Sequence, residues 1–274
     1  IFLKKQASSS RKVIFYIKVL MDLFYSTKIL IKFIYLINSM KNEFAYTISF
    51  SNEGKNVNSF LKKLKKNINS KTDKVFCIVD TKTNHSTIKN LNNFCQNNKN
   101  FKILKYYKTK SFSETKLSAL KACQNFKFIF DIDGNMAHDT NSIKKFKKKI
   151  FQYKYEAVCG SRFLKTGKYI YGSSYQRFLL SYYGTKVVNF ILGLNFTDAT
   201  GGYICISSKI VKSILKNKIY SKTHFYHAEL KNIIHNYKFC EVPIIYKKSL
   251  SKIKYSTILL AIYNLFKLYM NKKT

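Results

Sequence analysis

From about residue 40 onward, the chain alternates short apolar runs with longer stretches whose apolar residues recur every three or four positions. Short apolar runs predict buried strands, and the period of 3.6 residues predicts amphipathic helices. The predicted strands are Phe44–Phe50, Val75–Val79, Phe101–Tyr107 and Phe126–Phe130, and the predicted helices between them are Asn56–Asn67, Ser86–Asn97 and Ser113–Ala122. This alternation indicates an α/β fold with a mainly parallel sheet flanked by helices.

Both ends of the chain carry long apolar stretches interrupted by lysines, at 13–37 and 255–270. Neither approaches the roughly 18 to 20 uncharged residues that span a bilayer, so we expect no simple transmembrane anchor. Apolar helices that bear lysines lie in a membrane interface or pack on their own domain, and the sequence leaves both open. We therefore divide the chain into an apolar, basic helical segment (1–40), a main α/β domain (41–254) and a C-terminal amphipathic helix (255–274).

Lys and Arg number 50 against 13 Asp and Glu, which gives a formal net charge of +37. Such a field attracts polyanions, including nucleic acid and anionic membranes. However, Lys, Asn, Ile, Phe and Tyr are abundant throughout, so much of this charge reflects a general compositional bias. Residue types that are rare are more informative. Two of the three arginines, Arg162 and Arg177, lie close together, and eight of the nine glycines fall between residues 134 and 202.

The six cysteines form no CxxC pair and lie in or beside apolar runs. This spacing favours reduced core thiols over a zinc site or disulfides, and hence a reducing compartment such as the cytoplasm.

Polar residues follow three of the predicted strands. They are Ser51-Asn52-Glu53, Asp80, and the pair Asp131 and Asp133. Ligands of parallel sheets gather at the carboxyl ends of the strands, so we expect one shared cleft there. Two carboxylates two residues apart suit a hard divalent cation, although an acidic turn that caps the next helix is an alternative. No glycine-rich phosphate loop follows the first strand, which argues against a dehydrogenase or a P-loop enzyme.

Seven short motifs occur in order between about Tyr46 and Lys252. They are Ser49-Phe-Ser51-Asn52-Glu53, Val79-Asp80, Asp131-Ile-Asp133-Gly-Asn135, Gly160-Ser161-Arg162, Arg177 with Ser181, Asp198-Ala-Thr200-Gly201-Gly202, and Glu241-Val242-Pro243-Ile244 followed by Ser251-Lys252. In this order they resemble family 2 glycosyltransferases, the inverting enzymes that include dolichyl-phosphate mannose synthase and other polyprenyl-phosphate sugar transferases. The chain departs from the family pattern at Ser49, Thr81 and Ile204.

The resemblance implies a GT-A fold, a GDP- or UDP-sugar donor, a polyprenyl-phosphate acceptor, and Mg²⁺ or Mn²⁺ as cofactor. The residues that it implies can be grouped by role. The metal ligands are Asp131, Asp133 and Asn135; the donor contacts are Ser49, Asn52, Glu53, Asp80 and Asp131; the acceptor contacts are Arg162, Arg177, Ser181, Lys247 and Lys248. Asp133, Arg162 and Arg177 are the predicted catalytic residues. An arginine offers a planar fork that matches phosphate oxygens, although a structural ion pair is an alternative role for either one.

The first hypothesis is metal-assisted transfer of a hexose, with inversion, to a polyprenyl (dolichyl-type) phosphate at the cytoplasmic face of a membrane. An ionised phosphate needs no strong general base. The first alternative is transfer to a saccharide hydroxyl in cell-surface polysaccharide synthesis, with Asp198 as base. The second is a non-catalytic basic protein that binds membranes or nucleic acid, which only the net charge supports; we expect no nucleic-acid partner.

Four further features have simpler explanations. The residues His224, His227 and His235 could suggest a metal site, but a satisfied or solvent-facing imidazole is the simpler interpretation. Glu229 is expected to be structural. The basic run Lys144–Lys149 is most simply a solvated helix face, with contact to anionic headgroups as the alternative.

Overall fold

The computed structural model describes residues 43–109, 111–135, 137–165, 168–169, 175–247 and 255–273. Residues 1–43 form one unit and the chain from Phe44 onward a second, and the first is almost wholly outside the described residues. The prediction of an apolar interfacial helix before residue 40 therefore remains a prediction.

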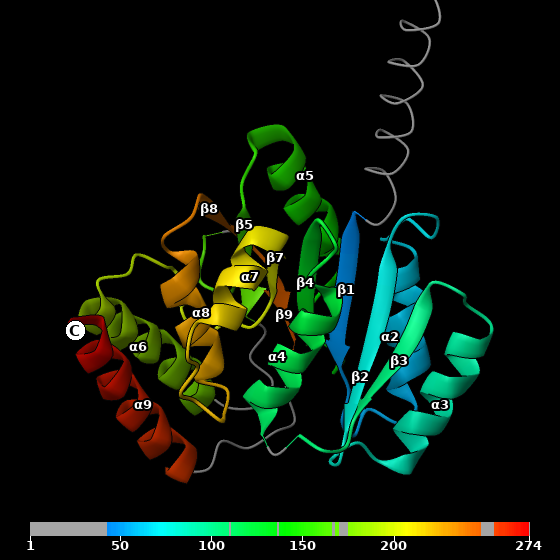
Figure 1. The fold of residues 1–274 in the computed structure, drawn as a ribbon, viewed down its shortest axis with the longest axis horizontal. Coiled ribbons are helices and arrows are strands. Elements are labelled where there is room, and N and C mark those ends of the chain that lie inside the picture. Colours follow the sequence, from blue (N-terminus) through cyan, green and yellow to red (C-terminus); the bar gives the residue numbers. More distant parts are fainter. Residues whose placement is uncertain are drawn as a thin grey trace, which may run out of the picture. The chain divides into compact units, whose positions relative to one another are not determined.

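Seven strands of the second unit form one sheet, in the order β3-β2-β1-β4-β7-β5-β8 (Figure 1). Their bounds are β1 Phe44–Ser49, β2 Lys74–Asp80, β3 Phe101–Tyr106, β4 Phe128–Asp133, β5 Ala157–Ser161, β7 Ile204–Ser207 and β8 Phe239–Pro243. Only β7 runs against its neighbours. The predicted α/β fold with a mainly parallel sheet is confirmed.

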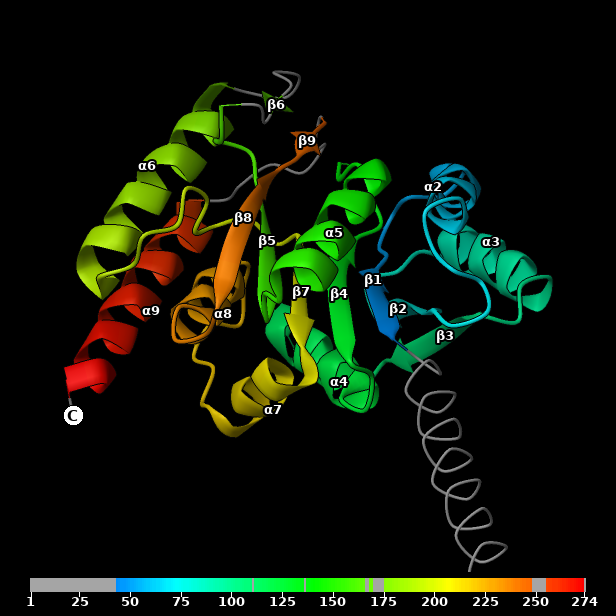
Figure 2. The same ribbon diagram turned by 90° about the horizontal axis from the view of Figure 1, so that it is seen from above.

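Helices cover both faces of this sheet (Figure 2). Their bounds are α2 Asn56–Lys65, α3 His85–Gln96, α4 Phe112–Cys123, α5 Ile143–Tyr153, α6 Tyr175–Leu192, α7 Ser208–Lys216, α8 Tyr226–Ile234 and α9 Tyr255–Lys273, with a short 3₁₀ helix at Thr140–Ser142. One hydrophobic core joins the sheet to α2, α3 and α5, and a second joins it to α4, α6, α7, α8 and α9. A small pair of strands, β6 (Lys168–Tyr169) and β9 (Ile245–Tyr246), lies outside the main sheet.

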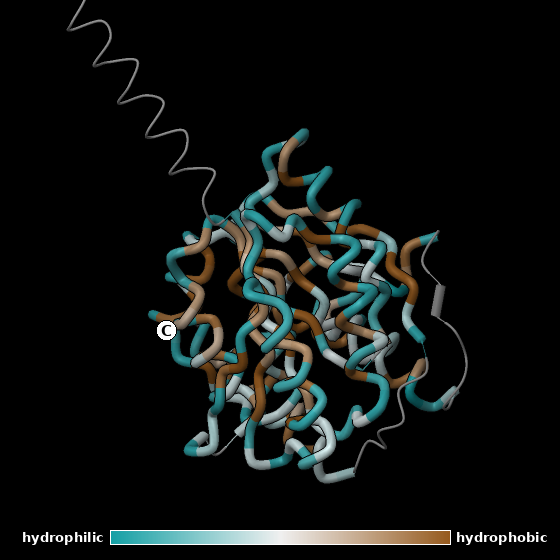
Figure 3. The backbone as a smooth tube through the Cα atoms, turned by 90° about the vertical axis from the view of Figure 1, so that its right-hand side faces the viewer, coloured by the Kyte–Doolittle hydropathy of each residue, from teal (hydrophilic) through white to brown (hydrophobic). Residues whose placement is uncertain are grey.

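The local sequence explains these elements. Helix α2 buries Val57, Phe60, Leu61 and Leu64, which is the spacing of one helical face. Helices α3, α4 and α7 each begin after an Asn or Ser whose side-chain oxygen accepts a backbone N–H of the first turn. Figure 3 shows how hydrophobic and hydrophilic positions alternate along the backbone of the helices.

The predicted strands and helices between residues 44 and 123 are confirmed to within one or two residues at each end. The fourth strand requires a correction, because β4 begins at Phe128 and extends through Asp133. The two carboxylates thus lie within the strand rather than in a turn after it. Pairing of β4 with β1 continues to Ser49 and Asp133, and this holds both Asp131 and Asp133 in extended backbone.

The C-terminal stretch forms helix α9, which lies beside α6 and buries Leu265 in the core. No helix in the described ranges has the length and hydropathy of a membrane span. All six cysteines are free thiols, as predicted, and four of them are buried.

Phe130 tests the central packing. Its ring is fully buried and stacks on Tyr46 with the ring centroids 4.7 Å apart. We expect Phe130→Ala to lower the free energy of unfolding by about 3–5 kcal/mol, measured by urea denaturation. Phe190 is 89% exposed, so Phe190→Ala should change it by less than about 0.5 kcal/mol. Equal effects of the two substitutions would contradict the burial of Phe130 in the core.

Candidate active site

The carboxyl ends of β1, β2 and β4 meet at one edge of the sheet, because these strands are adjacent and parallel. Ser49 lies opposite Asp133 in the register of β1 and β4. The Gly134 N–H donates to the Ser49 carbonyl at 2.9 Å, and the Asn84 N–H donates to the Ser51 carbonyl at 3.0 Å. The three polar clusters found in the sequence therefore share this edge, as expected.

An ammonium group from α4 joins the two carboxylates of β4. Nζ of Lys116 lies 2.6 Å from Oδ1 of Asp131 and 3.4 Å from Oδ1 of Asp133. The side chains of Lys116 and Asp131 are 2% and 1% exposed, whereas that of Asp133 is 31% exposed. Burial alone would lower the pKa of Lys116, but the two carboxylates hold it above its ordinary value. Lys116 is therefore a permanent cation of the site.

Lys116 was not predicted from the sequence, although the pattern of buried positions in α4 contains a signal for it. The buried positions of this helix include Lys116, Ala119, Leu120 and Cys123, so the lysine occupies the apolar face. A lysine at such a position must find a carboxylate partner. In a chain with so many lysines this single position is easily overlooked.

Three imidazoles act electrostatically on Asp133. Burial alone would raise the pKa of this carboxyl, but Lys116 and then His138, His227 and His224 hold it below its ordinary value. Burial lowers the pKa of His138 to about 4, and its Nδ1 lies 3.5 Å from the backbone N of Asp133. His138 is therefore neutral near pH 7, and it is a second site residue that the sequence did not predict.

His227 is positioned by a glycine. A Cβ at Gly202 would lie 2.6 Å from Cε1 of His227, so only glycine leaves room for the ring there. The expectation of satisfied or solvent-facing histidines is wrong for His227, which is buried. His227 and His235 are not exposed, and each has a buried Nδ1 without a hydrogen-bond partner. His224 is exposed and lies against Phe112.

The predicted donor-binding residues line the same edge. Glu53 is half-buried, and its carboxylate accepts the Ser51 N–H. Burial raises the pKa of Glu53, and the nearby charge of Asp133 adds to this rise. Asp80 ends β2 and accepts the Lys82 N–H at 2.9 Å. Asn52 is exposed, and the Ser49 hydroxyl is buried without a partner. These side chains leave polar atoms available along the ends of β1 and β2.

A divalent cation fits the acidic pair. Oδ2 of Asp131 is buried without a hydrogen-bond partner, and Asp133 is partly open to solvent. In the described part of the chain, no group of three or more His, Cys, Asp or Glu could hold a metal by itself. Mg²⁺ is commonly held by one or two carboxylates, with phosphates and water as its other ligands, so two carboxylates suffice. The Asn135 amide oxygen accepts the Ala137 N–H at 3.0 Å.

Arg162 lies in a buried ion pair, which is the alternative that the sequence left open. Its Nε and Nη2 donate to the two oxygens of Asp198 at 2.7 and 2.8 Å, and Nη2 also donates to Thr200. Burial alone would raise the pKa of Asp198, but Arg162 and Lys231 lower it to about 2. Asp198 is fully buried, and its two oxygens bind Arg162, so it is not placed to act as a base.

Further contacts hold the turn that carries Asp198. The Glu241 carboxylate accepts the N–H groups of Thr197 and Asp198 at 2.6 and 3.0 Å, and buried Lys231 donates to the Asp198 carbonyl at 2.6 Å. A Cβ at Gly201 would lie 2.9 Å from Oδ2 of Asp198. Three of the seven motifs thus join in one structural cluster around this turn. Glu229 is structural as well, since it accepts the N–H groups of Tyr220 and Ser221.

Arg177 differs from Arg162. It lies half-buried on α6, and Ser181 follows one turn later. Loss of hydration is the main cause of the lowered pKa of His224, and the charge of Arg177 adds to it. Lys247 lines a polar hollow of about 390 Å³ together with His138, Lys63 and Lys144. Lys248 lies outside the described residues, as do Ser251 and Lys252.

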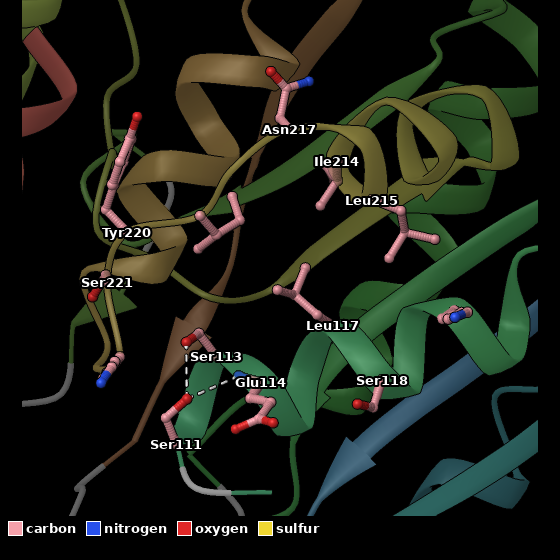
Figure 4. Close-up of a pocket in the computed structure, with 13 residues that line it drawn as sticks. Ser111, Ser113, Glu114, Leu117, Ser118, Ile214, Leu215, Asn217, Tyr220 and Ser221 are labelled. Atoms are coloured by element: carbon pink, nitrogen blue, oxygen red, sulfur yellow. Dashed lines mark hydrogen bonds between the residues drawn. The ribbon is translucent and has the colours of Figure 1, made fainter. Parts of the chain in front are cut away.

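A separate hollow of about 390 Å³ lies between α4 and the segment that follows α7 (Figure 4). Leu117, Ile214 and Leu215 form its apolar wall, and Ser111, Ser113 and Glu114 line its polar side, where the Ser111 hydroxyl bonds to its neighbours. None of the predicted site residues lines it. The chemistry is therefore assigned to the strand ends.

This arrangement of sheet, helices and acidic strand end defines a GT-A glycosyltransferase. The chain belongs to glycosyl transferase family 2, whose model matches residues 47–215. It is thus a member of an enzyme family rather than a non-catalytic basic protein. The resemblance to dolichyl-phosphate mannose synthase in particular stays a prediction.

Solved structures of similar fold agree with this. Glucosyl-3-phosphoglycerate synthase from Mycobacterium tuberculosis, with UDP, has a TM-score of 0.61 at 9% identity, over 83% of this chain and 80% of that one. The same synthase with Mn²⁺, UDP and glucosyl-3-phosphoglycerate has a TM-score of 0.56 at 10% identity, over 82% and 79%. TarS 1–349 from S. aureus, with UDP-GlcNAc, has a TM-score of 0.53 at 12% identity, over 77% and 60%. At these identities the likeness shows the fold.

The buried pair of Arg162 and Asp198 gives a test of stability. We expect Asp198→Asn to lower the free energy of unfolding at pH 7 by about 3–5 kcal/mol, because it leaves a buried guanidinium without its counter-ion. Since the folded pKa of about 2 lies below the ordinary value of 3.8, the pair stabilises the fold above pH 4. Its contribution falls as the pH drops toward 2, and chemical denaturation across this range measures it.

The matched control is Glu156→Gln, which removes an ion pair between Lys209, 69% exposed, and a carboxylate that is 30% exposed. It should cost less than about 1 kcal/mol. A loss for Asp198→Asn as small as that of the control would contradict the structural role assigned to the pair.

Proposed function

We propose that the enzyme moves a hexose from a nucleoside-diphosphate sugar to a polyprenyl phosphate, with inversion and with the help of Mg²⁺ or Mn²⁺. The observation that carries the proposal is the burial of Asp198 in its ion pair with Arg162. An acceptor hydroxyl needs a general base. Asp198 is the carboxylate considered for that role, and both of its oxygens already bind Arg162. A phosphate acceptor is already ionised near neutral pH and needs no general base.

The same observation weakens the alternative of a saccharide hydroxyl as acceptor, which required Asp198 beside the metal. A phosphorylated acceptor also agrees with the charge of Arg177, which acts on His224, one of the imidazoles that act on Asp133. The structural neighbour from Mycobacterium tuberculosis is described in complex with phosphoglyceric acid, so a small phosphorylated acid belongs among the acceptors to be tested.

The residues divide the work between donor and acceptor. Glu53 and Asp80, with Ser49 and Asn52, would hold the base and ribose at the ends of β1 and β2. Asp131 and Asp133, with Asn135 nearby, would hold the cation, which offsets negative charge on the diphosphate leaving group. Lys116 contacts both carboxylates and favours their ionised forms, although burial still raises the pKa of Asp131. Arg177 and Ser181 would bind the acceptor phosphate, with Lys247 and Lys248 as further cationic contacts. Arg162 acts indirectly, because it positions the turn at Asp198.

The deciding experiment is transfer of labelled sugar from a panel of GDP- and UDP-sugars to a short polyprenyl phosphate, a saccharide and phosphoglyceric acid, with and without Mn²⁺. We expect product with the polyprenyl phosphate only, and a loss of about 100-fold or more for Asp133→Asn, because the cation then loses its exposed carboxylate. Glu156→Gln is the control of equal charge change and should keep full activity. Transfer to the saccharide alone would refute the proposed acceptor.

Arg177 provides a second test. Arg177→Lys keeps the charge but removes the planar fork, so we expect the KM for polyprenyl phosphate to rise about tenfold or more while the KM for the donor is unchanged. Lys186→Arg, the reverse exchange on the same helix, should alter neither constant. Steady-state kinetics with each substrate varied in turn measures both. An equal rise in both KM values would show that Arg177 supports the fold rather than the acceptor.

A further inference from the structure

The exposed large apolar side chains of the described residues are concentrated on two helices. Fifteen such side chains are exposed, and twelve of them belong to α6 and α9. On α6 they are Tyr175, Tyr182, Tyr183, Val187 and Phe190; on α9 they are Tyr255, Leu259, Leu260, Ile262, Tyr263, Phe266 and Met270. Phe190 is 89% exposed and Tyr255 is 74% exposed. Single exposed apolar residues are ordinary, but a concentration of this kind marks an interaction surface.

The two sets of side chains face away from the core. Helices α6 and α9 lie side by side at the same end of the sheet (Figures 1 and 2). On the opposite side of each helix, Val188, Leu192 and Leu265 are buried in the same hydrophobic core. Because the exposed positions recur every three or four residues, they form one stripe on each helix. We call these two stripes together the α6–α9 surface.

The charges on these helices have one sign. Neither helix contains an Asp or a Glu, whereas Arg177 and Lys186 lie on α6 and Lys267 and Lys272 lie on α9. Five of the exposed side chains are tyrosines, whose rings favour the boundary between lipid headgroups and acyl chains. An apolar stripe with cations and tyrosines is typical of a helix that lies in the plane of a membrane interface.

A second copy of the chain is a poorer occupant of this surface. Self-association would bring together two surfaces that carry cations and no carboxylate, in chains that each have a net charge of +37. Anionic lipid headgroups offer the complementary charge, and each basic residue near such a surface adds to the attraction. The charge and the apolar area therefore favour the same partner.

We propose that the α6–α9 surface docks on an anionic lipid bilayer. The proposal goes beyond the assignment of the acceptor, because it concerns a surface outside the ends of β1, β2 and β4 and holds for any substrate. It does place Arg177 and Ser181, the acceptor residues proposed above, on a helix that contacts the membrane. A lipid-borne acceptor could then reach the site from the bilayer without leaving it completely.

The test is co-sedimentation of the full chain with vesicles of phosphatidylcholine, with and without phosphatidylglycerol. We expect binding to the anionic vesicles, and a fall of about tenfold or more in the partition coefficient for the double variant Phe190→Ser with Phe266→Ser. Phe151→Ser is the apolar control, since Phe151 on α5 is also exposed, and it should bind like the wild type. Urea denaturation should show that the double variant is as stable as the wild type.

The cations are tested separately. Lys186→Gln with Lys267→Gln should weaken binding to the anionic vesicles more than Lys62→Gln with Lys148→Gln, which removes the same charge from exposed positions on α2 and α5. Equal effects of the two pairs would mean that net charge alone causes binding and would overturn the proposal. Wild-type vesicle binding by the double phenylalanine variant would also overturn the proposal. Light scattering then shows whether the same substitutions dissociate a dimer, in which case a second copy of the chain occupies the surface.

Failure of this proposal can be distinguished from failure of the proposed function. The double phenylalanine variant should keep wild-type transfer to a short, water-soluble polyprenyl phosphate. It should lose transfer to a long-chain acceptor embedded in anionic vesicles. Equal transfer to the embedded acceptor by variant and wild type would overturn docking through this surface, whatever the identity of the donor.

Discussion

The candidate site depends on the placement of one ammonium group beside two carboxylates. Asp131 and Asp133 lie two residues apart in a strand of a buried sheet, where repulsion and loss of hydration both oppose ionisation. Lys116 reaches both from α4, and its own burial is tolerable only because the carboxylates are there. With both carboxylates ionised, the three groups carry one net negative charge, and Asp133 is the carboxylate that is open to solvent. That residual charge is available for a divalent cation and a diphosphate.

A second buried ion pair has a different role. Arg162 and Asp198 neutralise each other, and Glu241 and Lys231 bind the backbone on either side of Asp198. Gly201 and Gly202 leave room for the Asp198 carboxylate and for the His227 ring. The turn therefore connects β5, β8 and α8 to the imidazole beside Asp133. After burial and Asp133, the charges of Arg162 and Asp198 also act on the pKa of His138, so residues away from the strand ends contribute to the electrostatics of the site.

The sequence predicted most of the fold because its information is local. Apolar runs, helical periods and caps fix each element from Phe44 to Cys123, and the parallel arrangement brings Glu53, Asp80 and Asp133 to one edge. The partners of charged residues are set by tertiary packing, which spacing does not reveal. Lys116 meets Asp131 across 15 positions and Arg162 meets Asp198 across 36. The sequence therefore named Arg162 correctly as unusual but offered no means of choosing between phosphate and Asp198 as its partner.

The small number of carboxylates links the interior to the surface. Of the thirteen acidic residues, several are engaged in buried or backbone contacts, among them Asp73, Asp131, Asp198, Glu229 and Glu241. Few remain to pair with the surface lysines, so the positive field outside is largely uncompensated. Helices α6 and α9, which have no carboxylate at all, are where this field coincides with exposed apolar area. The abundance of lysine makes any single lysine uninformative. The absence of Asp and Glu from α6 and α9 is informative, because it distinguishes the α6–α9 surface.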